Sequence, residues 1–108
     1  MWLATAPSAT QSGASTIARS GMALEEARLA ASANNVANLN TVGYSAREVT
    51  AQSTADGGVS ARTRATGQPT DLLQETITQM ELVVAYTANL AVIRTSDQMS
   101  GTLLNTFV

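Results

Sequence analysis

The sequence predicts a mainly α protein in which two long terminal helices form an antiparallel coiled-coil hairpin, with a short β-hairpin or loop between them. Apolar residues recur at steps of three and four along two long stretches, which is typical of amphipathic helices. Between them, two short alternating stretches flank a Gly-rich turn. The chain of 108 residues is long enough for one domain. Its predicted segments are 1–13, 14–40, 41–69 and 70–108.

The first two segments differ in pattern. Residues 1–13 are small and polar without periodicity, so we expect a mobile N-terminal tail. Residues 14–40 predict the first axial helix, because a single helical face collects apolar side chains. These side chains are Ala18, Met22, Leu29, Ala33 and Val36. The helix is expected to end in an Asn-rich stretch before Gly43, since such residues tolerate left-handed conformations.

Residues 41–69 predict a turn followed by a small β-hairpin. Val49 and Ala51 alternate with polar residues, and Val59 and Ala61 do the same further along. The stretch Ala55–Gly58 between them contains Asp-Gly, which is a strong hairpin turn signal. An irregular loop is the alternative for this segment.

Residues 70–108 predict the second axial helix. Asp71 lies three residues before Gln74, a spacing typical of a helix N-cap, and no Gly or Pro follows until Gly101. Its apolar residues fall in more than one row, whereas one partner helix covers a single stripe. The main row is Val83, Tyr86, Leu90, Ile93, Asp97, Ser100, Leu104 and Phe107, and a second row is Leu73, Ile77, Met80, Val84 and Ala91. We therefore expect neighbouring chains to complete the core.

Composition excludes several classes of function. Alanine, serine and threonine are abundant, while cysteine, histidine and lysine are absent. The chain therefore lacks thiol and imidazole nucleophiles and the usual nitrogen and sulfur metal ligands, and we expect no enzyme, no cofactor and no metal site. A formal charge of −2 gives no indication of nucleic-acid binding, which usually requires a basic surface. The strongly apolar run Leu82–Tyr86 is far shorter than the roughly 20 residues of a spanning helix, so we expect no direct membrane insertion.

Two blocks of the sequence resemble a known family. The first contains Ser20-Gly21-Met22, Arg28-Leu29, the stretch Ala33–Asn38, and Asn40-Thr41-Val42-Gly43-Tyr44. It is similar to the N-terminal signature of bacterial flagellar axial proteins, which form the rod, the hook and the hook-associated parts. The second contains Tyr86–Asn89, Val92–Met99 and Leu103-Leu104-Asn105, and it is similar to the C-terminal block of that family. Val42 stands where the family usually has proline.

The resemblance implies a function. Because the middle segment is short, it implies a short, proximal-rod-like member of the flagellar basal-body rod family. Such a protein is a structural subunit that packs its terminal helices with other rod subunits, and possibly with itself, to transmit torque. The resemblance also implies type III export through the flagellar export apparatus into the periplasmic rod, without a cleaved signal peptide. The alternatives are a junction or adaptor protein at the base of the flagellum, and a free-standing helical protein-binding module.

The expected protein–protein interface consists of seam residues and amides from the two blocks. These residues are Met22, Leu29, Asn34, Asn35, Val36, Asn38, Gly43, Tyr44, Val83, Tyr86, Asn89, Leu90, Ile93, Asp97 and Leu104. Asparagines near a helix end can also have a purely structural role, since they cap helices and form hydrogen bonds with nearby backbone groups. An unpaired buried acid is costly, so Asp97 needs a partner unless the row turns outward there and leaves it in solvent.

Overall fold

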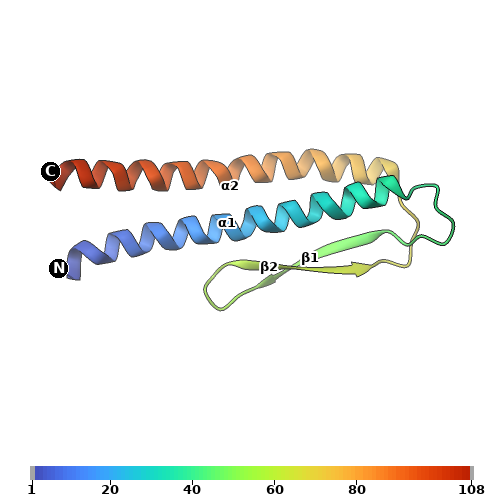
Figure 1. The fold of residues 1–108 in the computed structure, drawn as a ribbon, viewed down its shortest axis with the longest axis horizontal. Coiled ribbons are helices and arrows are strands. Elements are labelled where there is room, and N and C mark those ends of the chain that lie inside the picture. Colours follow the sequence, from blue (N-terminus) through green and yellow to red (C-terminus); the bar gives the residue numbers. More distant parts are fainter. Residues whose placement is uncertain (1, 108) are drawn as a thin grey trace.

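Two long helices and a β-hairpin lie side by side in a flat, elongated molecule (Figure 1), with principal extents of 63 × 25 × 14 Å. The computed structural model describes the backbone of residues 2–107 and the side chains of residues 13–104. In chain order the elements are α1 (Trp2–Ala37), β1 (Arg47–Ser53), β2 (Val59–Ala65) and α2 (Leu72–Phe107). The predicted mainly α fold, with a β-hairpin between two helices, is confirmed.

Helix α1 is the middle layer of the molecule. It packs against α2 and against both strands, whereas neither strand packs against α2 in the described part of the chain. The two helices run in opposite directions, so both ends of the chain lie at the same end of the molecule (Figure 1). The hairpin is therefore held to the rest of the fold mainly through α1.

Helix α1 begins well before residue 14, the predicted boundary, and includes residues that the sequence analysis assigned to the tail. This segment contains Pro7 and Gly13, both poor helix formers, so its helical backbone does not follow from propensity but extends a helix that is already formed. The side chains of residues 1–12 lie outside the described part of the chain. The mobility of the tail stays a prediction.

Strands β1 and β2 form the predicted antiparallel hairpin, with Val49 opposite Thr63 and Ser53 opposite Val59. The turn is built around Asp56. Its carboxylate accepts hydrogen bonds from the Thr54 hydroxyl and from the backbone N–H of Gly58, the latter at 3.1 Å. These bonds favour the charged form, so the Thr54 hydroxyl and then the Gly58 N–H lower the pKa of Asp56. Gly57 supplies the left-handed residue of the turn, with φ at +89°.

Helix α2 begins as the sequence predicts. The Asp71 carboxylate accepts hydrogen bonds from the backbone N–H groups of Leu73 and Gln74, at 3.1 and 3.3 Å. These bonds satisfy N–H groups that have no partner within the helix. The Asp71 side chain is therefore the N-cap of α2.

The buried core is small. Among the described side chains, its apolar members are Ala18, Leu24, Ala46, Val49, Leu82 and Ile93. The second predicted row of α2 is exposed in the isolated chain, and Val83 and Leu104 of the main row are exposed too. Helix α2 thus carries much more apolar surface than α1 covers.

The stretch Leu72–Leu104 of α2 is long and apolar enough, by length and composition alone, to cross a membrane. The strongly apolar run Leu82–Tyr86 is only part of this stretch, and alanine, valine and methionine residues are spread along the rest of it. Core helices of soluble proteins have the same length and composition. Such core helices are mostly buried, however, whereas only 6% of the apolar 18-residue window of α2 is buried, so the fold of the single chain leaves this stretch uncovered.

Gly21 is the point where α1 and α2 come into close contact. A methyl group at this position would lie 2.9 Å from Nδ2 and 3.1 Å from Oδ1 of Asn89 on α2. Glycine leaves room for the Asn89 amide between the helices, at the cost of helix propensity. The small residue therefore sets the spacing of the helix pair at this level.

Alanine substitutions at Gly21 and Gly101 should separate the effect of close helix packing from the effect of helix propensity on stability. Gly101→Ala should raise the free energy of unfolding by up to about 1 kcal/mol, because alanine favours helix and no neighbouring element lies within 4 Å. Gly21→Ala should raise the free energy of unfolding by about 1 kcal/mol less than Gly101→Ala does, because the Asn89 amide must move. Thermal unfolding followed by circular dichroism measures both. In an Asn89→Ala background the difference should disappear, and equal gains in the wild-type background would contradict the close contact.

Candidate assembly interface

The end of α1 is fixed by the side chain of Asn35, which is 1% exposed. Its Nδ2 donates to the backbone oxygen of Arg47 at 2.9 Å and to Oε1 of Glu75 at 3.0 Å. Its Oδ1 accepts from the Tyr44 hydroxyl and from the Arg47 backbone N–H, both at 2.7 Å. An amide has two N–H donors and two acceptor positions, so this side chain is fully satisfied.

The partners of Asn35 belong to three parts of the fold. Tyr44 lies in the turn after α1, Arg47 is the first residue of β1, and Glu75 lies in the first turns of α2. The Thr70 hydroxyl, just before α2, also donates to the backbone oxygen of Asn35 at 3.0 Å. One buried side chain therefore joins both helices, the turn and the hairpin. Its hydrogen bonds are all made within the chain.

The other predicted asparagines near this helix end behave differently. Asn38 donates to the side-chain and backbone oxygens of Asn34, at 3.0 and 2.9 Å, and accepts from the Thr41 hydroxyl at 3.1 Å. These bonds are exposed and local, as in a helix-end cap. Gly43 follows with φ at +78°, which fits its predicted left-handed turn role.

A second group of contacts joins α1 to its neighbours at Ser20 and Gly21. The Ser20 hydroxyl donates to the Ile17 backbone oxygen at 2.6 Å and accepts from the Val59 N–H of β2 at 3.1 Å. Gly58 also lies close to Ser20, since a methyl group on Gly58 would come within 2.8 Å of the Ser20 oxygen. Adjacent residues of α1 therefore contact the hairpin and, through Asn89, α2. Sequence analysis quoted Ser20 in the family signature but did not predict this role.

One side of the helix pair carries an open apolar groove of about 300 Å³. Both helices line it and no hairpin residue does, so we call it the open-face groove. Its lining residues are Glu25, Glu26, Leu29, Gln79, Leu82, Val83 and Tyr86. Three of the predicted interface residues, Leu29, Val83 and Tyr86, therefore meet here. Leu29 and Val83 are exposed, at 48% and 67%, and Tyr86 is half-buried.

The remaining predicted interface residues divide by burial. Ile93 is buried within the chain, and Met22, Val36, Asn89 and Leu90 are half-buried. Asp97 is exposed, which agrees with the alternative that its row turns outward. Leu104 is also exposed. The half-buried and exposed residues keep surface available to a neighbour, whereas Asn35 and Ile93 do not.

Glu25 of α1 is one of the residues that line the open-face groove. It is 8% exposed, and its Oε2 accepts no hydrogen bond from any described residue. The nearest basic group is Nη1 of Arg28, at 3.8 Å. The two residues are three positions apart on α1, a spacing that places side chains on the same side of a helix.

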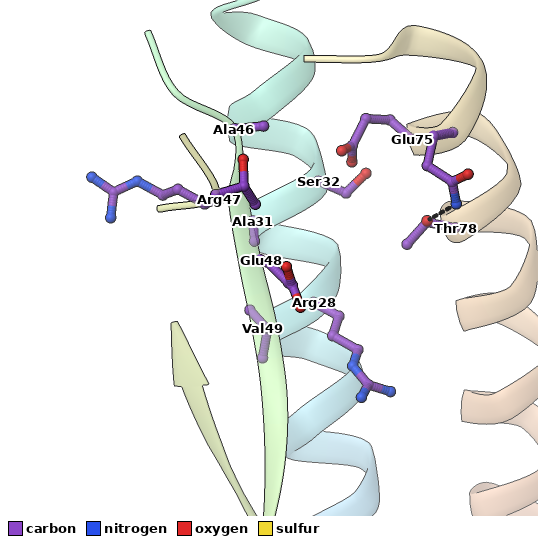
Figure 2. A pocket seen from close by; sticks show the side chains of 11 residues that line it. Arg28, Ala31, Ser32, Ala46, Arg47, Glu48, Val49, Glu75 and Thr78 are labelled. Carbon is purple, nitrogen blue, oxygen red and sulfur yellow. Dashed lines mark hydrogen bonds between the residues drawn. The ribbon is translucent and has the colours of Figure 1, made fainter. Parts of the chain in front are cut away.

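A second hollow of about 340 Å³ lies between α1, β1 and α2 (Figure 2). Three of its four charged side chains, those of Glu75, Glu48 and Arg28, have partners in the chain. Glu75 accepts from Asn35, Glu48 pairs with Arg64 at 3.3 Å, and Arg28 lies beside Glu25. Figure 2 shows the Arg47 side chain pointing away from α2. This hollow is therefore a polar joint of the fold.

Removing the Asn35 amide should weaken the whole joint. Asn35→Ala should lower the free energy of unfolding by about 2–3 kcal/mol, because it leaves the part-buried backbone N–H and C=O of Arg47 without their partners. Asn38→Ala should cost less than about 1 kcal/mol, because its bonds are exposed and local. Urea unfolding followed by circular dichroism compares the two variants. Similar losses for both would contradict the central role of Asn35.

A comparison with known protein families gives one match. Residues 16–44 match the sequence model of the Flagella basal body rod protein family. The matched segment includes Ser20, Gly21 and Asn35, which join α1 to the hairpin and to α2. No curated protein matches the chain. Residues 16–44 are thus similar to the flagella basal body rod protein family, which confirms the resemblance found in the first block of the sequence.

Proposed function

We propose that the protein is a structural subunit of the flagellar basal-body rod that packs its helices against neighbouring rod subunits. One observation carries the proposal: α2 leaves apolar side chains uncovered on more than one face. Met80, Val83 and Val84 are each about two-thirds exposed or more, at 67%, 67% and 71%. Full burial of such a side chain stabilises by about 1.5–3 kcal/mol, so neighbouring subunits gain by covering them.

The spacing of the covered side of α2 supports coiled-coil packing against α1. Buried and half-buried residues follow one another at steps of four and three, the spacing of a heptad seam. They are Leu82, Tyr86, Asn89, Ile93, Ser96 and Ser100. We therefore propose that the two helices pair as an antiparallel coiled coil, with small and polar residues at several seam positions.

The shape of the helix pair fits a subunit that carries torque. Each helix has 36 residues, which corresponds to about 54 Å at 1.5 Å per residue. Contacts along such an element spread a twisting load over many side chains. The same proposal includes delivery by the flagellar export apparatus and a place in the periplasmic part of the basal body, as the family resemblance implies.

Deleting the gene and imaging purified basal bodies beside a complemented strain tests the rod role. We expect truncated rods that lack hooks, because a missing segment stops everything distal to it from assembling. Complete flagella with normal motility would contradict the proposal and favour a free-standing binding module. Complete rods detached from the basal ring would instead favour a junction or adaptor protein.

Adding one negative charge to the uncovered helix surface should block incorporation. Val83→Glu places a carboxylate on the exposed face that we expect a neighbour to cover, and burying it there is costly. Gln52→Glu adds the same charge on the exposed strand β1 and serves as the matched control. Basal bodies from each strain, probed for the subunit, provide the measurement. Normal incorporation of Val83→Glu would contradict the use of this surface.

A further inference from the structure

We propose that the hairpin binds a second copy of this chain edge to edge, with the outer edge of β2 pairing with the outer edge of β1 in its neighbour. The inference rests on the proposed function and deepens it, because it names a contact between subunits that the helices do not make. In the described part of the chain β1 and β2 form a two-stranded sheet, so each strand has one edge without a strand beside it. An isolated pair of strands is marginally stable in water, and further strands stabilise it.

The hydrogen bonds at the two ends of the hairpin show which backbone groups face outward. The N–H of Thr54 donates to the Gly58 oxygen at 2.9 Å. The N–H of Thr66 likewise donates to the Ala46 oxygen at 2.9 Å. Because every second residue of an antiparallel pair bonds the opposite strand, the even-numbered residues bond across the hairpin. The odd-numbered residues of both strands therefore point their N–H and C=O groups away from the hairpin, at its two outer edges.

Side chains of α1 cap one end of each outer edge. The Asn35 amide bonds both outward groups of Arg47, at the start of β1. The Ser20 hydroxyl accepts from the outward N–H of Val59, at the start of β2. The other outward groups have no hydrogen-bond partner among the described residues, and they belong to Val49, Ala51 and Ser53 on β1 and to Ala61, Thr63 and Ala65 on β2.

The uncapped part of β2 is open to a neighbour. All residues of β2 after Val59 are exposed, and on β1 Ala51 and Ser53 are exposed as well. The hairpin lies on the side of α1 that faces away from α2 (Figure 1), and neither strand packs against α2 in the described part of the chain. A strand of another copy can therefore reach the β2 edge without displacing α2.

The two caps define the register between the copies. Each edge keeps three outward residues, and one antiparallel register uses all six. In that register the pairs are Ala61 with Ser53, Thr63 with Ala51, and Ala65 with Val49 of the neighbour. A slip by two residues leaves one outward residue of each strand unpaired, and a slip by one residue turns the outward groups of one strand away from the other.

The charges on the hairpin disfavour pairing of β2 with β2 of a second copy. β2 carries Arg62 and Arg64 and no acid. Full pairing of two β2 edges places Arg62 directly opposite Arg64, and like charges in that position are destabilising. In the proposed register Arg62 instead lies opposite Gln52 of the neighbour, and Arg64 lies one diagonal step from Glu48 of the neighbour. An amide and a carboxylate therefore meet the two guanidinium groups.

The contact repeats from copy to copy because its two edges differ. Pairing β1 with β1 would leave the β2 edges of both copies open, whereas the proposed contact uses both edges of every inner copy. Such head-to-tail contacts build open, extendable arrays rather than closed dimers. This property suits a subunit that we propose to be part of a rod.

Proline substitutions test which edges pair. Thr63→Pro removes the central outward N–H of β2, and Ala51→Pro removes that of β1. Neither N–H bonds within the hairpin, and edge positions of this kind tolerate proline. Each variant alone should self-associate at least about tenfold more weakly in Kd than the wild type, because each contact needs one intact edge of both kinds. Thr63→Ala and Ala51→Ser keep the N–H groups and should associate as the wild type does.

Mixing the two proline variants gives the sharpest outcome. An equimolar mixture should form dimers and stop there, because the intact β2 edge of the Ala51→Pro chain meets the intact β1 edge of the Thr63→Pro chain. Sedimentation velocity of the full chains measures association, and circular dichroism compares their folds.

Cysteine cross-linking tests the register without proline, and it decides the matter if a proline variant does not fold. The wild-type chain contains no cysteine. A Gln52→Cys chain mixed with an Arg62→Cys chain should form a mixed disulfide, because residues directly opposite at such a pair lie about 4.5 Å apart between Cα atoms, within disulfide range. Gln52→Cys mixed with Arg64→Cys is the off-register control and should form far less of it. Non-reducing gels with a size tag on one chain measure the product.

Several results would overturn the inference. Association that is unchanged in both proline variants would assign self-association to the uncovered surface of α2. Weakening in only one of the two variants would indicate two-fold pairing of one edge with itself. A wild-type chain that stays monomeric up to its solubility limit, or equal cross-linking in the matched and off-register mixtures, would also contradict the edge contact.

The proposed rod function is judged separately from this contact. Normal rods in an Ala51→Pro strain would reject the edge contact while leaving the rod role intact. Complete flagella in the deletion strain would reject the rod role whatever the sedimentation results are.

Discussion

The side-chain amide of Asn35 uses both of its donor positions and both of its acceptor positions inside the fold. Its partners are the turn at Tyr44, the first residue of β1, and Glu75 near the start of α2. With so few large apolar side chains in the core, nonpolar packing alone leaves the ends of these elements weakly oriented. The Asn35 amide determines how the ends of these elements are oriented, because hydrogen bonds fix angles and distances whereas apolar contacts do not. The position of the hairpin and the start of α2 both depend on it.

Periodicity and turn chemistry were enough to predict the elements. The Asp-Gly turn, the Asp71 cap and the two helical stretches were all read from local patterns, and local patterns determine local structure. The early start of α1 was missed because the prediction required an apolar stripe. Helix formation is cooperative, so a helix that is already formed can extend through a segment without such a stripe.

The tertiary contacts were predicted less well, for a different reason. The sequence analysis ranked rows of α2 by their large apolar side chains, but the side that meets α1 includes Asn89 and Ser96. Gly21 brings the helices close, and close helices require small or flat side chains between them. The burial of Glu25 and the use of Asn35 depend on which elements meet, which no single helical pattern contains. The sequence predicts that α2 has more apolar rows than one partner helix can cover. The structure leaves the second row uncovered in the single chain.

The layering of the fold has a mechanical consequence. Both strands rest on α1, and neither packs against α2 in the described part of the chain. A force applied to α2 therefore reaches the hairpin along two routes only, through the length of α1 and through the joint around Asn35. Because α1 packs against α2 and against both strands, it is the element through which a load on α2 is passed to the hairpin.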